Sequence, residues 1–199
     1  MEEFIYIYIL WLLWCLTTFF FNKTKLRTVY SLGILLLIIC VPYTTVIGEI
    51  TLNSGVILLV FYSFGLLMML SMPMKKYLYT LLFAYLYVIY FVWYITNPIL
   101  SYPYFMLIGI IVATIVLQIF ERDFHQRILI WITSLAFGQV LYTLICWSYS
   151  LEFTINYHDY YILFCSVLLL LCLINIWLLL LKRMELVIQG IESKKRWTY

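Results

Sequence analysis

The sequence has few charged residues, and none of them lies inside its long apolar runs. Asp, Glu, Lys and Arg together make up 11% of the 199 residues, whereas apolar residues make up 66%. A soluble protein typically has about 25% charged residues, and a soluble domain cannot bury so much apolar surface. The composition therefore predicts an integral membrane protein.

The lack of charge within the apolar runs excludes several classes of membrane protein. A charged side chain at the bilayer centre costs about 3 kcal/mol or more, so it is retained mainly where it has a function. Its absence argues against a proton-coupled transporter, a cation pump and a voltage sensor. A seven-span retinal protein needs a lysine within its last span, but Lys182 lies at the end of the last run.

Reactive and metal-binding motifs are also missing. The sequence contains no HExxH or GxSxG motif and only two histidines, His125 and His158, which we place on opposite sides of the membrane. Its five cysteines form no CxxC pair, so we interpret them as small apolar side chains. We therefore predict that the protein is not an enzyme and that it has no metal site and no cofactor.

What the sequence does contain is a series of continuous apolar runs, each about as long as the roughly 20 residues that cross a bilayer as a helix. Continuous runs favour helices over the alternating strands of a membrane barrel. The predicted fold is all-α: a polytopic integral membrane protein with seven transmembrane helices in one domain, residues 1–181. The start, Met1-Glu2-Glu3, lacks the features of a cleaved signal peptide, so we expect the first span to be kept. The predicted spans are about 4–21, 28–47, 55–72, 77–96, 102–120, 128–149 and 160–181.

The twelve Lys and Arg residues occur only after the first, third, fifth and seventh spans. Because cytoplasmic segments are enriched in Lys and Arg, this alternation predicts an outside N-terminus and a cytoplasmic C-terminus. Residues 182–199 combine an apolar helical face with basic residues. They predict a basic amphipathic tail on anionic lipid, with a partner-binding tail as the alternative. The predicted membrane-surface residues are Lys182, Arg183, Lys194, Lys195 and Arg196.

Aromatic residues follow one face of the fourth span at spacings of 4, 4, 3 and 4. Tyrosine is common at the membrane interface, but Tyr87 and Tyr90 lie mid-span, where their hydroxyl groups need partners. Packing is one interpretation. The other is a groove for a lipid, an isoprenoid or a sugar-lipid headgroup. The candidate groove residues are Tyr79, Phe83, Tyr87, Tyr90 and Tyr94, together with Gln139 near the middle of the sixth span.

Other features within the spans indicate contacts between helices. Gln118 and Asn175 lie at similar depths in the fifth and seventh spans, so they are candidates for an interhelical hydrogen bond. The small-residue pairs Gly109/Ala113 and Ser134/Gly138 allow helices to approach closely. We interpret the neighbours His158 and Asp159 as an ordinary outer-loop pair, with weak metal binding or pH sensing as the alternative.

The length, the start MEEFIYIY, the seven compact spans and the KKRW-type basic end resemble the YphA family, small uncharacterised membrane proteins of spore-forming Gram-positive bacteria. The resemblance covers the whole chain. It implies a multi-pass protein of the bacterial plasma membrane, linked to the envelope or to sporulation, and it carries over no catalytic residues. The vitamin-binding subunits of energy-coupling transporters have a similar length. They usually have six spans and an AxxxA motif in the first, and the first span here has no alanine.

Two hypotheses for function remain from the sequence. The first is a non-enzymatic scaffold or accessory subunit of a membrane or envelope complex. The second is a binder or transporter of a lipid or small molecule that uses the Tyr-lined face of the fourth span. The expected partners are the lipid bilayer and another membrane protein. Nucleic acid is not expected, because the net charge of +3 comes from basic residues at the inner rim of the membrane.

Overall fold

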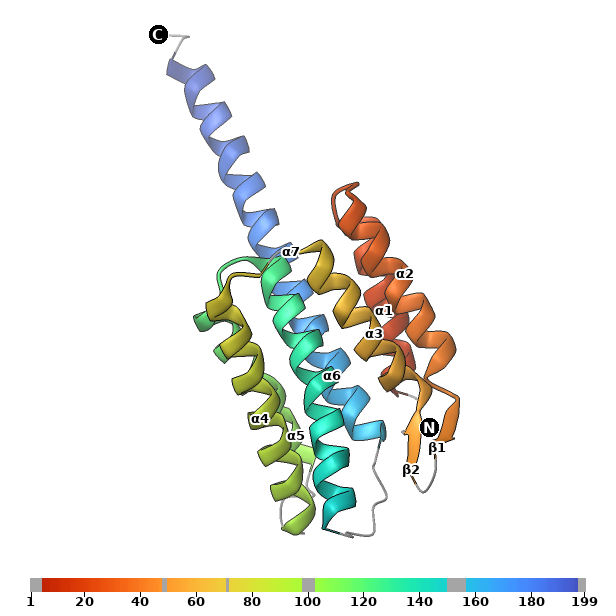
Figure 1. Ribbon diagram of the computed structural model, residues 1–199. Helices are drawn as coiled ribbons and strands as arrows, with labels where there is room; N and C mark the ends of the chain where they lie inside the picture. Colours follow the sequence, from red (N-terminus) through yellow and green to blue (C-terminus); the bar gives the residue numbers. More distant parts are fainter. Residues whose placement is uncertain (1–4, 48–49, 71, 98–102, 150–156, 197–199) are drawn as a thin grey trace.

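The computed structural model describes residues 5–47, 50–70, 72–97, 103–149 and 157–196. Within these residues the chain forms seven helices and one two-stranded hairpin (Figure 1). The helices confirm the predicted all-helical architecture, to which the structure adds the hairpin. The helices are α1 (Ile5–Phe20), α2 (Lys25–Cys40), α3 (Ser54–Met69), α4 (Met74–Thr96), α5 (Pro103–Phe120), α6 (Phe124–Ser148) and α7 (Tyr157–Arg196).

Several of these helices have the length and composition of membrane spans. In the described part of the chain, three helical segments are long and apolar enough to cross a bilayer: Met74–Tyr94, Phe124–Ser148 and Tyr157–Leu186. Three shorter apolar helices accompany them: Ile5–Phe20, Ser54–Met69 and Phe105–Phe120.

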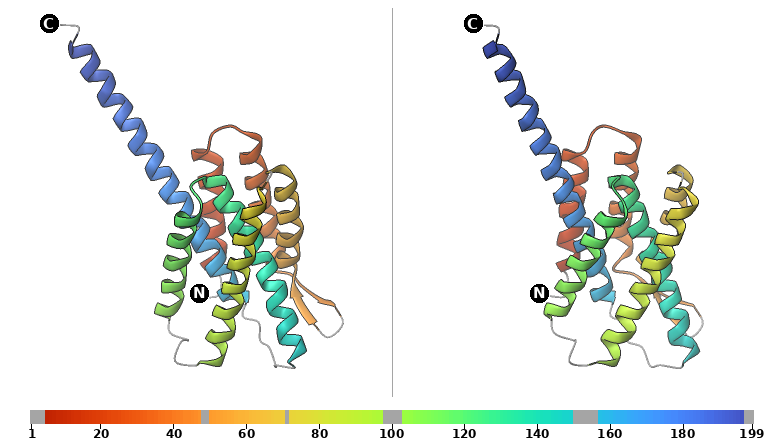
Figure 2. Two further views of the ribbon diagram at one scale, coloured as in Figure 1. Left: turned by 60° about the vertical axis from the view of Figure 1, so that its left-hand side comes forward. Right: turned by 90° about the vertical axis from the view of Figure 1, so that its left-hand side faces the viewer.

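Helix α6 and the first half of α7 form the centre of the bundle. Buried residues occur along almost the whole of α6, from Phe124 to Cys146. Helices α3 and α4 pack against α6, helices α1 and α5 pack against α7, and α2 joins α1 and α3 (Figure 2). The consecutive helices α4 and α5 therefore each pack mainly on a central helix, although a short connection joins them.

The segment between α2 and α3 corrects the predicted second span, which was placed at 28–47. Helix α2 ends at Cys40, shortly before Pro42, because proline cannot donate a helical hydrogen bond and restricts the residue before it. Strands β1 (Thr44–Ile47) and β2 (Ile50–Asn53) follow as an antiparallel pair. The β-branched residues that dominate both strands favour this extended backbone.

Asn53 joins this hairpin to three helices, and only 4% of its surface is exposed. It is the N-cap of α3, where its Oδ1 accepts a hydrogen bond from the Gly55 N–H at 2.8 Å. The same oxygen accepts a hydrogen bond from the Tyr161 hydroxyl of α7 at 2.6 Å. Its Nδ2 donates to the carbonyl oxygen of Val41, at the end of α2, at 2.8 Å. One side chain thus links the ends of α2 and α3 to α7.

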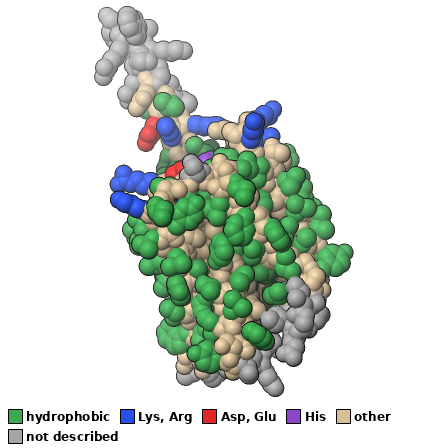
Figure 3. All heavy atoms as spheres, viewed as in Figure 1, with side chains coloured by type: hydrophobic (Ala, Val, Ile, Leu, Met, Phe, Trp, Pro, Cys, Tyr) green, Lys and Arg blue, Asp and Glu red, His purple; other side chains and the backbone are tan. Residues whose placement is uncertain are grey.

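The opposite end of the bundle carries the basic residues. In Figure 3 the blue Lys and Arg side chains gather at the end from which α7 projects. Lys76, at the start of α4, forms an ion pair with Glu121, just after α5, with 2.5 Å between Nζ and Oε2. The basic residues with described side chains are Lys23, Lys25, Arg27, Lys75, Lys76, Arg122, Arg127, Lys182 and Arg183.

Helix α7 is a single helix of 40 residues. The sequence predicts a span that ends at residue 181 and a separate tail, but the backbone remains helical through Arg196 because residues 182–196 contain no proline. The last part of α7 extends away from the bundle (Figure 1). The side chains of Lys194, Lys195 and Arg196 lie outside the described residues, so their contact with a membrane surface stays a prediction.

Candidate ligand-binding groove

A groove with a volume of about 280 Å³ lies between α4 and α5. Its walls come from these two helices, and its floor comes from Trp131 of α6 and Leu163 of α7. The rim residues Leu86 and Ile89 are 49% and 61% exposed, so the groove borders the outer surface of the bundle. The remaining lining residues are Phe83, Tyr87, Tyr90, Trp93, Gly109, Val112, Ala113 and Val116.

Aromatic contacts join α4 to α5 at both ends of this groove. At the basic end, the Phe120 ring centroid lies 5.1 Å from that of Tyr79 and 6.2 Å from that of Phe83. At the other end, the Tyr90 ring stacks on Phe105 with centroids 5.4 Å apart, and Trp93 lies edge-on to the same ring at 5.7 Å. The two aromatic clusters bound the groove along the helix axes, and the small residues of α5 leave space between them.

The groove follows α4 and α5 through the middle of the bundle. It extends along α4 from Phe83 to Trp93, which is a distance of about 15 Å at 1.5 Å per residue. Trp93 is close to the end of α4 at Thr96. On α5 the lining extends from Gly109 to Val116, about one turn before the end of that helix at Phe120. The groove is therefore central along the helix axes.

Tyr87 connects the groove wall to the central helix. Its hydroxyl donates a hydrogen bond to Oε1 of Gln139, a side chain that is 1% exposed. The ring fits against α6 because residue 138 is glycine: a Cβ at this position would lie 2.7 Å from Cδ1 of Tyr87. Among the described residues, Nε2 of Gln139 is buried without a hydrogen-bond partner.

Tyr90 brings a polar atom to the wall of the groove. Its hydroxyl oxygen is buried, and no described residue forms a hydrogen bond with it. The ring and the hydroxyl lie over Gly109 of α5, where a Cβ would be 3.2 Å from the Tyr90 oxygen. A tyrosine hydroxyl both donates and accepts hydrogen bonds, so this group has unused bonding capacity next to the groove.

The structure separates the predicted groove residues into four positions. Phe83, Tyr87 and Tyr90 line the groove. Tyr79 lies in the aromatic cluster at the basic end. Tyr94 lies beyond the other end, where its hydroxyl hydrogen-bonds to the Asp159 carboxylate. Gln139 lies behind Tyr87.

The sequence interpretation missed the second wall and the floor of the groove. Trp131 and Leu163 come from helices whose packing against α4 and α5 is not encoded in local spacing. The pair Gly109 and Ala113 was the available signal, because small residues mark a surface where another group approaches closely. Gly109 does lie close to Tyr90 of α4, as the predicted close approach of helices requires, and both residues of the pair also line the groove.

The other predicted polar residues lie apart from the groove. Gln118 and Asn175 are half-buried on the contacting helices α5 and α7, but among the described residues no hydrogen bond joins them. His158 Nδ1 lies 3.4 Å from Oδ1 of Asp159, and its ring is edge-on to that of Tyr6. No group of three His, Cys, Asp or Glu side chains in the described residues is placed to hold a metal ion.

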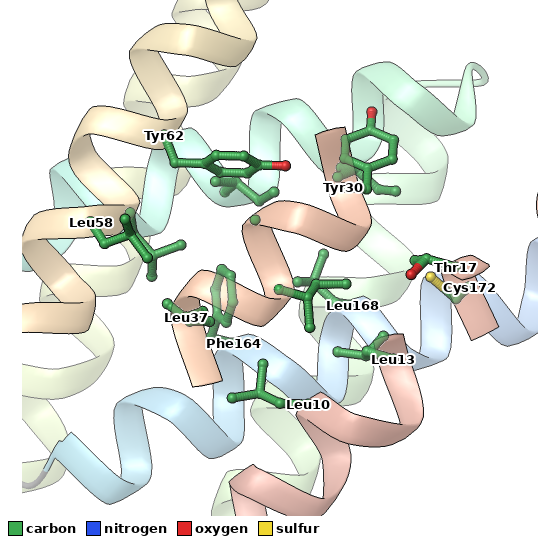
Figure 4. A pocket seen from close by; sticks show the side chains of 15 residues that line it. Leu10, Leu13, Thr17, Tyr30, Leu37, Leu58, Tyr62, Phe164, Leu168 and Cys172 are labelled. Atoms are coloured by element: carbon green, nitrogen blue, oxygen red, sulfur yellow. The ribbon is translucent and has the colours of Figure 1, made fainter. Parts of the chain in front are cut away.

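A second, smaller cavity of about 50 Å³ lies among α1, α2, α3, α6 and α7 (Figure 4). Its walls are mainly leucine and isoleucine side chains, together with Tyr30 and Tyr62. Both tyrosines have partners: Tyr62 donates to the Val29 carbonyl oxygen at 3.2 Å, and the Tyr30 hydroxyl lies 3.4 Å from Nδ1 of His125. Ligand sites usually have volumes of about 300–1,000 Å³, so the groove between α4 and α5 is the better candidate.

Comparisons with known proteins agree with a membrane protein of this kind. The family model described as YphA-like integral membrane protein matches residues 2–197. The chain is 30% identical over 155 residues to a protein of Bacillus subtilis (strain 168) that carries the name uncharacterized protein YphA. This match covers 73% of each chain. No solved structure matched the chain. Because the family model matches nearly the whole chain, the protein belongs to the YphA-like integral membrane protein family.

Proposed function

We propose that this protein is a non-enzymatic membrane protein that binds a lipid chain or a small apolar molecule in the groove between α4 and α5. The observation that carries the proposal is the groove itself. It is apolar, it is bounded by aromatic clusters at both ends, and its rim lies on the outer surface of the bundle.

The shape of the groove supports its occupation by an apolar molecule. The groove is open at its rim, so in a bilayer it would border the acyl chains. Apolar side chains that face a void lose dispersion contacts. A hydrocarbon chain that enters the groove from the bilayer restores these contacts with its walls.

Photo-crosslinking tests this proposal directly. The purified protein in phosphatidylcholine nanodiscs is irradiated with a lipid whose acyl chain carries a diazirine, and the adducts are mapped by mass spectrometry. We expect adducts on the groove residues of α4 and α5. Gly109→Leu should reduce them several-fold, because the new side chain enters the space between Tyr90 and α5. Gly65→Leu is the matched control, since a Cβ at Gly65 meets nothing within 4 Å.

The distribution of adducts decides the outcome. Adducts spread evenly over all lipid-facing helices, with no effect of Gly109→Leu, would overturn the proposed binding function. A loss of adducts in both glycine variants would also overturn the proposal, because a substitution outside the groove lining would then have the same effect as one within it.

We also propose that all seven helices cross the plasma membrane, with the N-terminus outside and the C-terminus in the cytoplasm. The basic residues at one end of the bundle support this orientation. Helices α1, α2 and α3 have 16 residues each, or about 24 Å, so we expect apolar flanking residues or local bilayer thinning to complete their spans. A C-terminal fluorescent fusion should fold in the cytoplasm. A C-terminal alkaline phosphatase fusion that is active outside the cell would contradict the proposed orientation.

A second candidate function is that of an accessory subunit for another membrane protein, and the extended end of α7 favours it. Beyond Arg183, this helix exposes Met184, Leu186 and Ile188 away from the bundle. Exposed apolar side chains of this kind are typical of a surface that is covered by a partner. Truncation after Arg183 should then remove a partner that co-purifies with the full chain in mild detergent. Identical co-purified proteins for both forms would argue against this role.

A further inference from the structure

The geometry points to a specific class of ligand: a single-chain amphiphile with a neutral carbonyl or hydroxyl oxygen that hydrogen-bonds to Tyr90. This inference rests on the proposed binding function and adds the chemistry of the ligand. It is based on three properties of the groove, which are its volume, the unused hydroxyl of Tyr90 and the lack of charged groups in its lining.

The volume favours one chain over two. The groove volume of about 280 Å³ is near the lower limit of the roughly 300–1,000 Å³ that ligand sites usually have. The groove is also about 15 Å long, from Phe83 to Trp93. An elongated space of this size fits part of one hydrocarbon chain. A diacyl lipid would have to leave its second chain in the bilayer.

Tyr90 provides the polar contact. The other tyrosine in the lining, Tyr87, already donates its hydroxyl hydrogen to Gln139. The Tyr90 oxygen is buried and has no partner among the described residues, although a buried polar group without a hydrogen bond costs about 1–3 kcal/mol. It lies over Gly109 at the wall of the groove. Binding therefore requires the Tyr90 ring to turn away from Gly109 until its hydroxyl faces the groove, where an oxygen atom on the ligand would satisfy it.

The surroundings favour a neutral oxygen over a charged head group. Every residue that lines the groove is uncharged. The carboxylate of Asp159 hydrogen-bonds to Tyr94 and its charge also acts on Tyr90, so an anionic head group beside Tyr90 would be repelled. Tyr90 is six residues before Thr96, which places it about 9 Å below the end of α4. A charge at that depth without an opposite charge beside it is costly, whereas an alcohol or a ketone requires only one hydrogen bond.

A competition experiment tests the inference. The probe is tetradecanol with a mid-chain diazirine, bound to the full-length protein in phosphatidylcholine nanodiscs. Unlabelled tetradecanol, 2-tetradecanone and tetradecane are the competitors, compared at equal concentration in the bilayer. We expect the alcohol and the ketone to displace the probe about tenfold better than the alkane does, because only they satisfy Tyr90. Tyr90→Phe should abolish this difference.

The control is Tyr85→Phe, the same substitution on the same helix at a residue that is 54% exposed. It should leave the preference for oxygen-bearing competitors unchanged. Two results would overturn the inference about the ligand oxygen but leave chain binding intact. In the first, the probe labels the groove but the alkane competes as well as the alcohol. In the second, Tyr90→Phe keeps the preference for oxygen-bearing competitors. If the probe does not label α4 and α5, both the inference and the proposed function fail.

Discussion

Replacement of Asn53 by alanine should destabilise the protein more than any other single loss of an amide side chain in the described structure. The amide makes three hydrogen bonds, to Gly55, Tyr161 and Val41, and it is almost completely buried. Each bond contributes about 1 kcal/mol net, and partners left buried without a bond add to the cost. We therefore expect a loss of about 3–5 kcal/mol in the free energy of unfolding.

The size of this effect can be measured by thermal unfolding of the detergent-solubilised protein, followed by circular dichroism. For a chain of about 200 residues, 1 kcal/mol shifts Tm by about 2–4 °C. Asn53→Ala should therefore lower Tm by about 10 °C. Asn97→Ala is the matched control. Its amide also lies at a helix end, but its hydrogen bonds to Trp93 and Thr96 are exposed and 3.3 Å long. This control should change the free energy of unfolding by less than about 0.5 kcal/mol.

A double-mutant cycle isolates the bond between Asn53 and the Tyr161 hydroxyl. Tyr161→Phe alone should cost about 1 kcal/mol. In the Tyr161→Phe background, Asn53→Ala should then cost about 1 kcal/mol less than in the wild-type protein, because the shared bond is already absent. Strictly additive effects, or a loss for Asn53→Ala no larger than that of the Asn97 control, would refute the proposed link between the hairpin and α7.

Two further predictions concern helix packing and acid stability. Gly138→Val should lower Tm, because the new Cβ would lie 2.7 Å from Cδ1 of Tyr87. Gly65→Ala, the control, should leave Tm unchanged or raise it slightly. Equal Tm shifts for the two variants in thermal scans would contradict this prediction. Partial burial raises the pKa of the Glu121 carboxyl group. This effect is outweighed by the hydrogen bond and charge of Lys76 and by the backbone N–H of Asp123, so the pKa is lowered from 4.5. A carboxyl group with a lowered pKa stabilises the fold above its unfolded pKa and loses this contribution as the pH falls through its folded pKa. Below a pH of about 4.5, wild-type Tm should therefore fall more steeply than that of Glu121→Gln, by an amount equivalent to at most about 1 kcal/mol; parallel pH profiles would contradict the role of this ion pair.

The sequence predicted the helices well because a long apolar run has few stable alternatives in a membrane. The β-hairpin was missed because Val46 and Ile47 are apolar enough to extend the preceding run. Its signal was present in the sequence, as two β-branched segments separated by Gly48 and Glu49. These two residues fall outside the described part of the chain, and the paired strands on either side establish the hairpin.

The candidate groove was only half predictable. The spacing of Phe83, Tyr87 and Tyr90 identifies one wall, because helical periodicity places these residues on one face. The opposite wall depends on α5 and the floor on α6 and α7, which is long-range packing that no local pattern specifies. In the structure, α4 packs on α6 and α5 packs on α7, which leaves the space between α4 and α5.

The central position of α6 and α7 has a consequence for biosynthesis. These two helices are the last to leave the ribosome, yet α3, α4 and α5 depend on them for their main inner contacts. The first five helices are therefore synthesised before the surfaces that will cover their inner faces have been made. Assembly of the bundle must wait for the C-terminal helices, so a nascent chain that stops before α6 leaves most of these inner faces uncovered.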